Sequence, residues 1–225
     1  GAGLLSKDDG TQVANGQGWA PIDKTIFTYG TKTLVNTYEG LAVQPVEGDV
    51  SEWLELMRHI YREHVDLVLD HLAFSLQKPM EKIRWQVMVV GAPRTGKTTT
   101  LRPIVRIWGS GAAVIDAGQI NSGWGNYWFG KKLVVVEEVF QPGNKGFYNQ
   151  LKTRFANDGV EYLNLKCEGT ALQQNLYEMF MFTNHKESLT FNANDDKLLV
   201  IEAPTERWDK ERYRALCDAI DGKED

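Results

Sequence analysis

This sequence has few cysteines, no long hydrophobic run and no excess of positive charge. These absences argue against a disulfide-stabilised protein, a membrane span and a generally basic nucleic-acid-coating protein. Its 225 residues include two cysteines, Cys167 and Cys217, and no signal peptide is visible. We therefore expect reduced thiols in a cytoplasm rather than a disulfide framework, with neither cysteine catalytic. No stretch approaches the roughly 18 apolar residues of a membrane span, so no membrane association is expected. The net charge of −5 argues weakly against a protein that coats nucleic acid.

What remains is the composition of an ordinary globular protein, 42% hydrophobic and 24% charged. Its length suits one α/β core with a small appended subdomain. Residues 1–49 have few periodic apolar positions apart from a β-like patch at 25–29, which predicts a linker or extended arm. Residues 50–80 show apolar side chains at three- and four-residue steps, which predict a helical lead-in. Residues 81–225 form the third part, the expected catalytic domain.

In this third part, short apolar runs alternate with helical segments, and this alternation predicts a central, mostly parallel five-stranded sheet flanked by helices. We expect the strands at 85–90, 112–116, 132–138, 178–183 and 197–202, and the helices near 97–108, 144–157 and 206–220. The segment from 160 to 174 reads as a β-hairpin around a turn at Glu168 and Gly169.

The strongest motif is a phosphate-binding loop of the pattern G-x-x-x-x-G-K-[ST], directly after the apolar run at 86–90. Two glycines let backbone N–H groups surround a phosphate chain, Lys97 neutralises charge on the β- and γ-phosphates, and Thr98 offers a hydroxyl to Mg²⁺. ATP and Mg²⁺ are therefore the expected cofactors. The residues assigned to nucleotide binding are Gly91, Ala92, Pro93, Arg94, Thr95, Gly96, Lys97, Thr98 and Thr99.

Two further strand ends supply the groups that hydrolysis requires. The apolar strand at 133–136 ends in Glu137, a candidate Mg²⁺ ligand, and Glu138, a candidate base for the attacking water. The strand at 179–182 leads to Asn184, a candidate sensor of the γ-phosphate. Taken separately, the acidic pair is compatible with a strand entering a solvent-facing loop, and Asn184 with an ordinary turn asparagine.

The order of these elements resembles the superfamily 3 helicases of viruses and phages. Phosphate loop, acidic strand end, lysine-bearing hairpin and strand ending in Asn184 follow one another within about 95 residues. The similarity is greatest to the helicase modules of phage primase-helicases and primase-polymerases, and it runs from about residue 33 to 204. It implies an AAA+-like P-loop fold, a hexameric ring with ATP between subunits, and single-stranded DNA in the channel. It also implies an upstream primase or polymerase domain in the same chain and a place in the host cytoplasm.

The resemblance also assigns residues outside the phosphate loop. Lys166, on the hairpin, matches the family's DNA contact, and Lys152 is a weaker candidate; an exposed lysine on a hairpin edge is the plain alternative. Lys197 stands where phage relatives usually carry an arginine that acts on the neighbouring subunit's nucleotide. A lysine there gives a point charge instead of a bidentate fork, and Arg154 or Arg207 are substitutes to consider.

We therefore expect an ATP-dependent DNA helicase or translocase module, with Lys97, Glu138, Asn184 and Lys197 as its catalytic residues. Two other functions stay open. One is a nucleotide-dependent assembly module with weak or no hydrolysis, which the lysine at position 197 favours. The other is a P-loop kinase, although the sequence has no clear lid with paired arginines.

Overall fold

The computed structural model describes residues 4–7, 10–122, 125–139, 151–152, 154–155, 157–167, 169–185 and 196–222. Its centre is a five-stranded sheet in the order β12-β6-β11-β8-β7, in which every neighbouring pair is parallel. The strands are β6 (Gln86–Val90), β7 (Ala112–Asp116), β8 (Leu133–Glu137), β11 (Glu178–Thr183) and β12 (Leu198–Glu202). The five strands expected from the apolar runs are thus confirmed to within a residue at each end.

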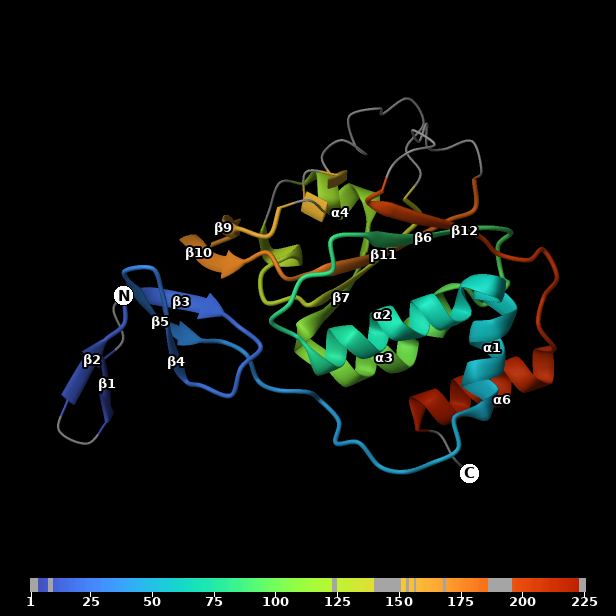
Figure 1. The fold of residues 1–225 in the computed structure, drawn as a ribbon, viewed down its shortest axis with the longest axis horizontal. Coiled ribbons are helices and arrows are strands. Elements are labelled where there is room, and N and C mark those ends of the chain that lie inside the picture. The colour runs from blue at the N-terminus through green and yellow to red at the C-terminus, as the bar shows by residue number, and fades with distance from the viewer. Residues whose placement is uncertain are drawn as a thin grey trace.

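Both faces of this sheet are covered, which explains why its strands read as continuous apolar runs. Val87 and Val89 of β6 face a core shared with the helices on one side, while Met88 faces a second core with β9. The helices of the first side are α1 (Ser51–Tyr61), α2 (Val65–Gln77), α3 (Arg102–Trp108) and α6 (Lys210–Asp221) (Figure 1).

The remaining helical segments are short. The predicted helix at 97–108 consists of a 3₁₀ turn, η2 (Thr98–Leu101), that continues into α3. Another 3₁₀ turn, η1 (Arg62–His64), joins α1 to α2, and η3 (Gly109–Gly111), α4 (Ala117–Asn121) and η4 (Gly125–Tyr127) follow α3. Most of the helix expected at 144–157 lies outside the described residues. No helix of the described part of the chain is long and apolar enough to cross a membrane.

A second five-stranded sheet, in the order β4-β5-β3-β10-β9, lies beside the first (Figure 1). It combines β3 (Gly16–Trp19), β4 (Ile26–Tyr29) and β5 (Lys32–Asn36) with the hairpin of β9 (Val160–Leu165) and β10 (Gly169–Gln174). The hairpin confirms the expectation for residues 160–174. A separate hairpin, β1 (Leu4–Lys7) with β2 (Gly10–Val13), precedes them.

The strands at 16–36 differ from the linker or extended arm that the composition of residues 1–49 predicts. Each has four or five residues, too few for a clear alternation of apolar side chains, and β3 pairs with β10 from the far end of the chain. Close approach explains one of the glycines: a Cβ on Gly18 would lie 2.7 Å from Cδ1 of Leu34. Gly18 is therefore a tightly packed residue of the sheet, although in the sequence it resembles a linker residue.

Candidate nucleotide-binding site

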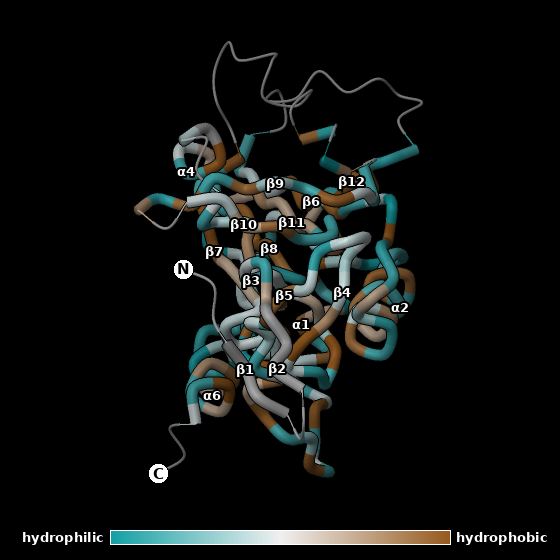
Figure 2. The backbone as a smooth tube through the Cα atoms, turned by 90° about the vertical axis from the view of Figure 1, so that its left-hand side faces the viewer, coloured by the Kyte–Doolittle hydropathy of each residue, from teal (hydrophilic) through white to brown (hydrophobic). Residues whose placement is uncertain are grey.

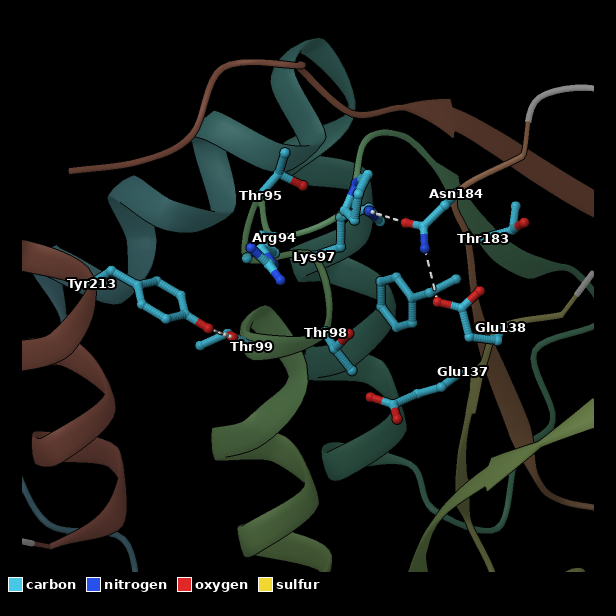
Figure 3. Close-up of a pocket in the computed structure, with 13 residues that line it drawn as sticks. Arg94, Thr95, Lys97, Thr98, Thr99, Glu137, Glu138, Thr183, Asn184 and Tyr213 are labelled. Carbon is cyan, nitrogen blue, oxygen red and sulfur yellow. Dashed lines mark hydrogen bonds between the residues drawn. The ribbon is translucent and has the colours of Figure 1, made fainter. Parts of the chain in front are cut away.

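A polar cavity of about 260 Å³ lies at the carboxyl ends of β6, β8 and β11, where α6 approaches (Figure 3). Carboxyl ends of neighbouring parallel strands meet at one edge of a sheet, which is where α/β proteins commonly bind ligands. The cavity brings together most of the residues that the sequence proposed. It is lined by Pro93, Arg94, Thr95, Gly96, Lys97, Thr98, Thr99, Glu137, Glu138, Phe182, Thr183, Asn184 and Tyr213.

The predicted phosphate loop, residues 91–98, connects β6 to η2 through a tight turn. Gly96 has φ +93°, where a side chain is strained, and a Cβ on Gly91 would lie 2.9 Å from Cβ of Ala203. Arg94 also adopts a left-handed conformation, with φ +63°. The Thr95 hydroxyl donates to the Ala92 carbonyl at 3.2 Å and closes the turn. The pattern's two glycines therefore have separate reasons, a close backbone approach at Gly91 and a positive φ at Gly96.

Lys97 lines the cavity, and the residue is only 7% exposed. Its ammonium donates to the carbonyls of Gly91 at 2.9 Å and Ala92 at 2.5 Å, and to Oδ1 of Asn184 at 3.1 Å. All three acceptors are neutral, and no ion pair within the described residues includes Lys97. Burial lowers the pKa of Lys97, against the raising influence of the Glu138 charge. A buried cation without a paired carboxylate favours an anionic ligand.

Asn184 links the lysine to the second carboxylate. Its Nδ2 donates to Oε1 of Glu138 at 2.8 Å while its Oδ1 accepts from Lys97, so one side chain of the loop and two at strand ends form one hydrogen-bonded chain (Figure 3). Glu138 itself has φ +50°, an uncommon backbone conformation that turns the chain just after β8. Because both ends of its amide are hydrogen-bonded, the side chain of Asn184 has a fixed orientation, unlike that of an ordinary turn asparagine.

Thr98 and Glu137 line the same cavity, one at the start of η2 and the other at the end of β8. A hydroxyl and an exposed carboxylate are oxygen donors of the kind that Mg²⁺ takes when it keeps several waters and binds phosphate. Together with the unpaired charge of Lys97, this donor set fits a magnesium-bound triphosphate.

Tyr213 of α6 is a lining residue that the sequence reasoning missed. Its hydroxyl lies 2.5 Å from Oγ1 of Thr99, and its ring lies over Gly96, where a Cβ would meet Cε2 at 3.4 Å. Burial raises the pKa of Tyr213. Arg212 beside it forms ion pairs with Glu52 and Glu55 of α1, which hold α6 against the cavity. Nothing local to position 213 signals this contact, because it depends on how α6 docks.

Lys197 does not lie in this cavity. Its carbonyl accepts from the Gln86 N–H at 2.9 Å, which places it at the amino ends of β6 and β12, the opposite edge of the sheet. Its ammonium lies 3.3 Å from Oδ2 of Asp196. Among the described residues, the cations that line the cavity are Lys97 and Arg94. A role for Lys197 in the same chain's nucleotide site is therefore excluded by its position.

The two predicted DNA contacts also lie outside the cavity. Lys166 is exposed at the turn between β9 and β10, and its N–H donates to Oδ1 of Asn126 at 2.7 Å. Lys152 is a half-buried residue of a helical segment, next to the buried Leu151. Neither placement contradicts a contact with DNA.

Comparisons with known proteins bear mainly on the fold. A protein-family model described as a family of unknown function (DUF5906) matches residues 89–204. The A form apo structure of the NrS-1 C-terminal region has a TM-score of 0.76 at 19% identity, covering 92% of this chain and 52% of that one. An apo structure of the same region, residues 305–718, gives 0.77 at 20% identity, with 92% and 53% covered. The chain thus spans about half the length of the structures it matches. No curated protein matches it significantly.

Proposed function

Because the chain belongs to DUF5906, a family of unknown function, its activity has to be inferred from its residues, and we propose an ATP-hydrolysing module of a phage replication protein. Specifically, we propose a helicase or translocase module of the superfamily 3 type, which moves single-stranded DNA through a hexameric ring. The sequence resemblance supports the family of motor, and the fold shared with the NrS-1 C-terminal region is compatible with it.

One observation carries this proposal: the hydrogen-bonded chain from Lys97 through Asn184 to Glu138, at the wall of one cavity. Phosphoryl transfer requires a cation for the phosphate charge and a group that aims and deprotonates the nucleophile. Lys97 supplies the first and Glu138 the second. Water is a suitable nucleophile for this arrangement, because the Glu138 carboxylate is exposed and solvent can reach it.

The residues divide the work as follows. Lys97 holds the terminal phosphates and offsets their charge, while the Glu138 carboxylate accepts a proton from the attacking water. Asn184 fixes the orientation of Glu138 and exchanges its bond with Lys97 for one with the γ-phosphate. Thr98 and Glu137 would hold Mg²⁺, which when bound offsets charge on the phosphate oxygens. These roles require the loop glycines, because backbone N–H groups complete the phosphate contacts.

Replacing the lysine tests the proposal directly. Lys97→Ala should abolish ATP turnover, by about a hundredfold or more, while the fold is retained, because the cation that offsets phosphate charge is lost. The measurement is phosphate release without any added acceptor, with circular dichroism as the check on folding. Lys78→Ala, an exposed lysine just after α2, is the matched control and should turn over ATP normally. Normal hydrolysis by Lys97→Ala would sink the assignment.

The position of Lys197 favours a second candidate, a nucleotide-dependent assembly module. Its distance from the chain's own cavity means that any cation beyond Lys97 and Arg94 must come from a residue outside the described part or from a neighbouring subunit. If that cation does not reach the γ-phosphate, hydrolysis is slow because the transition-state charge is not offset, and bound ATP then serves to hold subunits together. An assembly module would bind nucleotide tightly and increase in oligomer mass without releasing phosphate. A kinase would transfer the γ-phosphate only to an added acceptor.

A further inference from the structure

The second sheet has one face buried in the core and one face, which we call the open face, that combines exposed side chains with the buried Leu34 and Leu172. Leu163, Leu165 and Ala171 of β9 and β10 point into the core shared with the parallel sheet. Side chains alternate along a strand, so Tyr162 and Asn164 point the other way, and both are exposed. None of the residues that line the cavity at Lys97 belongs to this sheet, whose strands β3, β4 and β5 face the viewer in Figure 2, while α1 and α6 stand at the other end of the molecule in Figure 1. The open face is therefore separate from the cavity at Lys97.

Aromatic rings and a lysine gather on the open face, and we call this group the Tyr162 face: Phe27, Tyr29, Lys32, Tyr162 and Asn164. Tyr29 pairs in register with Lys32, and Phe27 pairs with Leu34 two residues along β5. The ammonium of Lys32 on β5 lies 5.1 Å from the centroid of the Tyr162 ring on β9, a cation–π contact that spans β3 and β10. The Tyr162 face thus has contributions from both ends of the sequence.

Tyr162 is the most exposed aromatic residue of the described strands, at 65%. An aromatic ring that stays open to water on a sheet surface offers a π-face on which a nucleic-acid base can stack. A flat ring of this kind suits a flat partner.

The charge of this surface selects the partner. Within β3, β4, β5, β9 and β10, Glu161 is the one acidic residue, and it points to the opposite face, where Asn175 donates to it at 2.9 Å. Arg154 lies 3.5 Å from the same carboxylate. The Tyr162 face itself therefore carries positive charge from Lys32. In a chain of net charge −5, this local sign favours an anionic ligand.

We propose that the Tyr162 face binds single-stranded nucleic acid, with one base stacked on the Tyr162 ring and a backbone phosphate at Lys32. Stacking on an aromatic ring with a nearby cation for the backbone is the usual way to hold a single strand without reading its sequence. The Asn164 side chain, which accepts from the Thr170 hydroxyl at 3.2 Å, adds a polar group beside the base. The site adds to the proposed function and rests on it for the class of ligand.

Anisotropy of a fluorescein-labelled oligothymidylate measures the binding. Tyr162→Ala should weaken it about tenfold, and Tyr162→Phe should bind nearly as the parent does, because the ring and not the hydroxyl stacks. Lys32→Ala should reduce the slope of log affinity against log salt by about 0.7, the share of one phosphate contact on a single strand. Oligouridylate serves as a second arm, and a loss in either arm supports the site.

Control variants separate this site from general damage. Phe74→Ala removes another exposed aromatic, on α2, and should leave the affinity unchanged. Tyr162→Thr keeps a good strand residue, so it tests the ring even if the alanine variant folds poorly. Equal affinity of Tyr162→Thr and the parent, or no binding by the parent, would overturn the inference.

Failure of the proposed function gives a different result. ATP turnover without oligonucleotide should be the same in Tyr162→Thr and the parent, because Tyr162 lies outside the nucleotide cavity. A parent chain that binds oligothymidylate through Tyr162 yet releases no phosphate would refute the ATPase and leave the nucleic-acid site standing.

Discussion

Asn184 stands between an ammonium and a carboxylate that would otherwise attract each other. Lys97 and Glu138 each bond to a different end of its amide, at 3.1 and 2.8 Å. A direct ion pair would use up the charge of Lys97 and the basicity of Glu138 together. The amide keeps both groups oriented while leaving the lysine's charge for a ligand.

Replacing the carboxylate isolates its chemistry. Glu138→Gln should lower ATP turnover by about 10² to 10⁴ while nucleotide binding is retained, because an amide of the same shape cannot accept the proton. Phosphate release in a single turnover, beside fluorescence of a bound nucleotide analogue, measures the two quantities.

Glu63→Gln in η1, an exposed glutamate whose side chain is 75% accessible, serves as the comparison variant. It should hydrolyse ATP as the parent does. Undiminished turnover in Glu138→Gln would mean that another group activates the water.

At this scale the sequence predicts the residues that belong to local motifs. The pattern at 91–98 and the ends of two apolar strands identify Lys97, Glu138 and Asn184 as candidates, and the structure brings them into one cavity. Tyr213 could not be found in this way, because its bond to Thr99 joins residues that only the docking of α6 brings together.

At the scale of elements, a buried ion pair ties α2 to the amino ends of β8 and β11. The Lys132 ammonium lies 2.7 Å from Oε1 of Glu178, and Nε2 of His71 lies 3.6 Å from Oε2. All three side chains are fully buried. Lys132 also donates to the Glu81 carbonyl at 2.9 Å, so this group connects four segments of the chain.

Removing one member of this buried ion pair should lower the stability of the protein. Glu178→Ala leaves the Lys132 charge buried and unpaired, and we expect about 3–5 kcal/mol of lost unfolding free energy. Urea denaturation near neutral pH measures it. Asp158→Ala breaks the exposed pair with Arg84 and should cost no more than about 1 kcal/mol. Equal losses in the two variants would contradict the structural role of the buried pair.

The same pair sets a pH dependence. Burial favours the neutral form of Glu178, but His71 and Lys132 outweigh it and lower the pKa of Glu178 below its ordinary value of 4.5. A carboxylate with a depressed folded-state pKa stabilises the protein above that ordinary value and loses this contribution as the pH falls through the folded-state pKa. The gap in stability between the parent and Glu178→Ala should therefore narrow in acid.

Which elements the sequence could predict depends on the range of their contacts. The five parallel strands are covered on both sides, so each is a continuous apolar run that local reading finds. The strands β3 and β5 are short and polar, and they are stabilised by β10, so no local pattern distinguishes them from a linker.

At the scale of the whole molecule, the opposite positions of Lys197 and the nucleotide cavity raise the question of assembly. If Lys197 acts on a neighbour's nucleotide, Lys197→Ala chains alone should turn over ATP at least tenfold more slowly. Mixing them with Lys97→Ala chains should restore activity, because the second chain donates Lys197 and the first retains an intact cavity. Phosphate release at increasing ratios of the two variants measures this complementation.

Two outcomes count against this role. Full activity of Lys197→Ala by itself would remove the residue from catalysis. A mixture that stays as inactive as its components would show that the loss in Lys197→Ala is structural, through its contact with Asp196 just before β12.

The pairing of Gly18 with Leu172 has a consequence for the order of folding, because the two residues lie far apart in the sequence. The strands β3 and β5 gain this partner only when a segment far along the sequence is in place, whereas β6 packs against α1 and α2, which directly precede it. Long-range pairing of this kind folds slowly, since a large loop must close before any contact compensates for the lost entropy. Refolding should therefore complete the parallel sheet first and the surface that carries Tyr162 last.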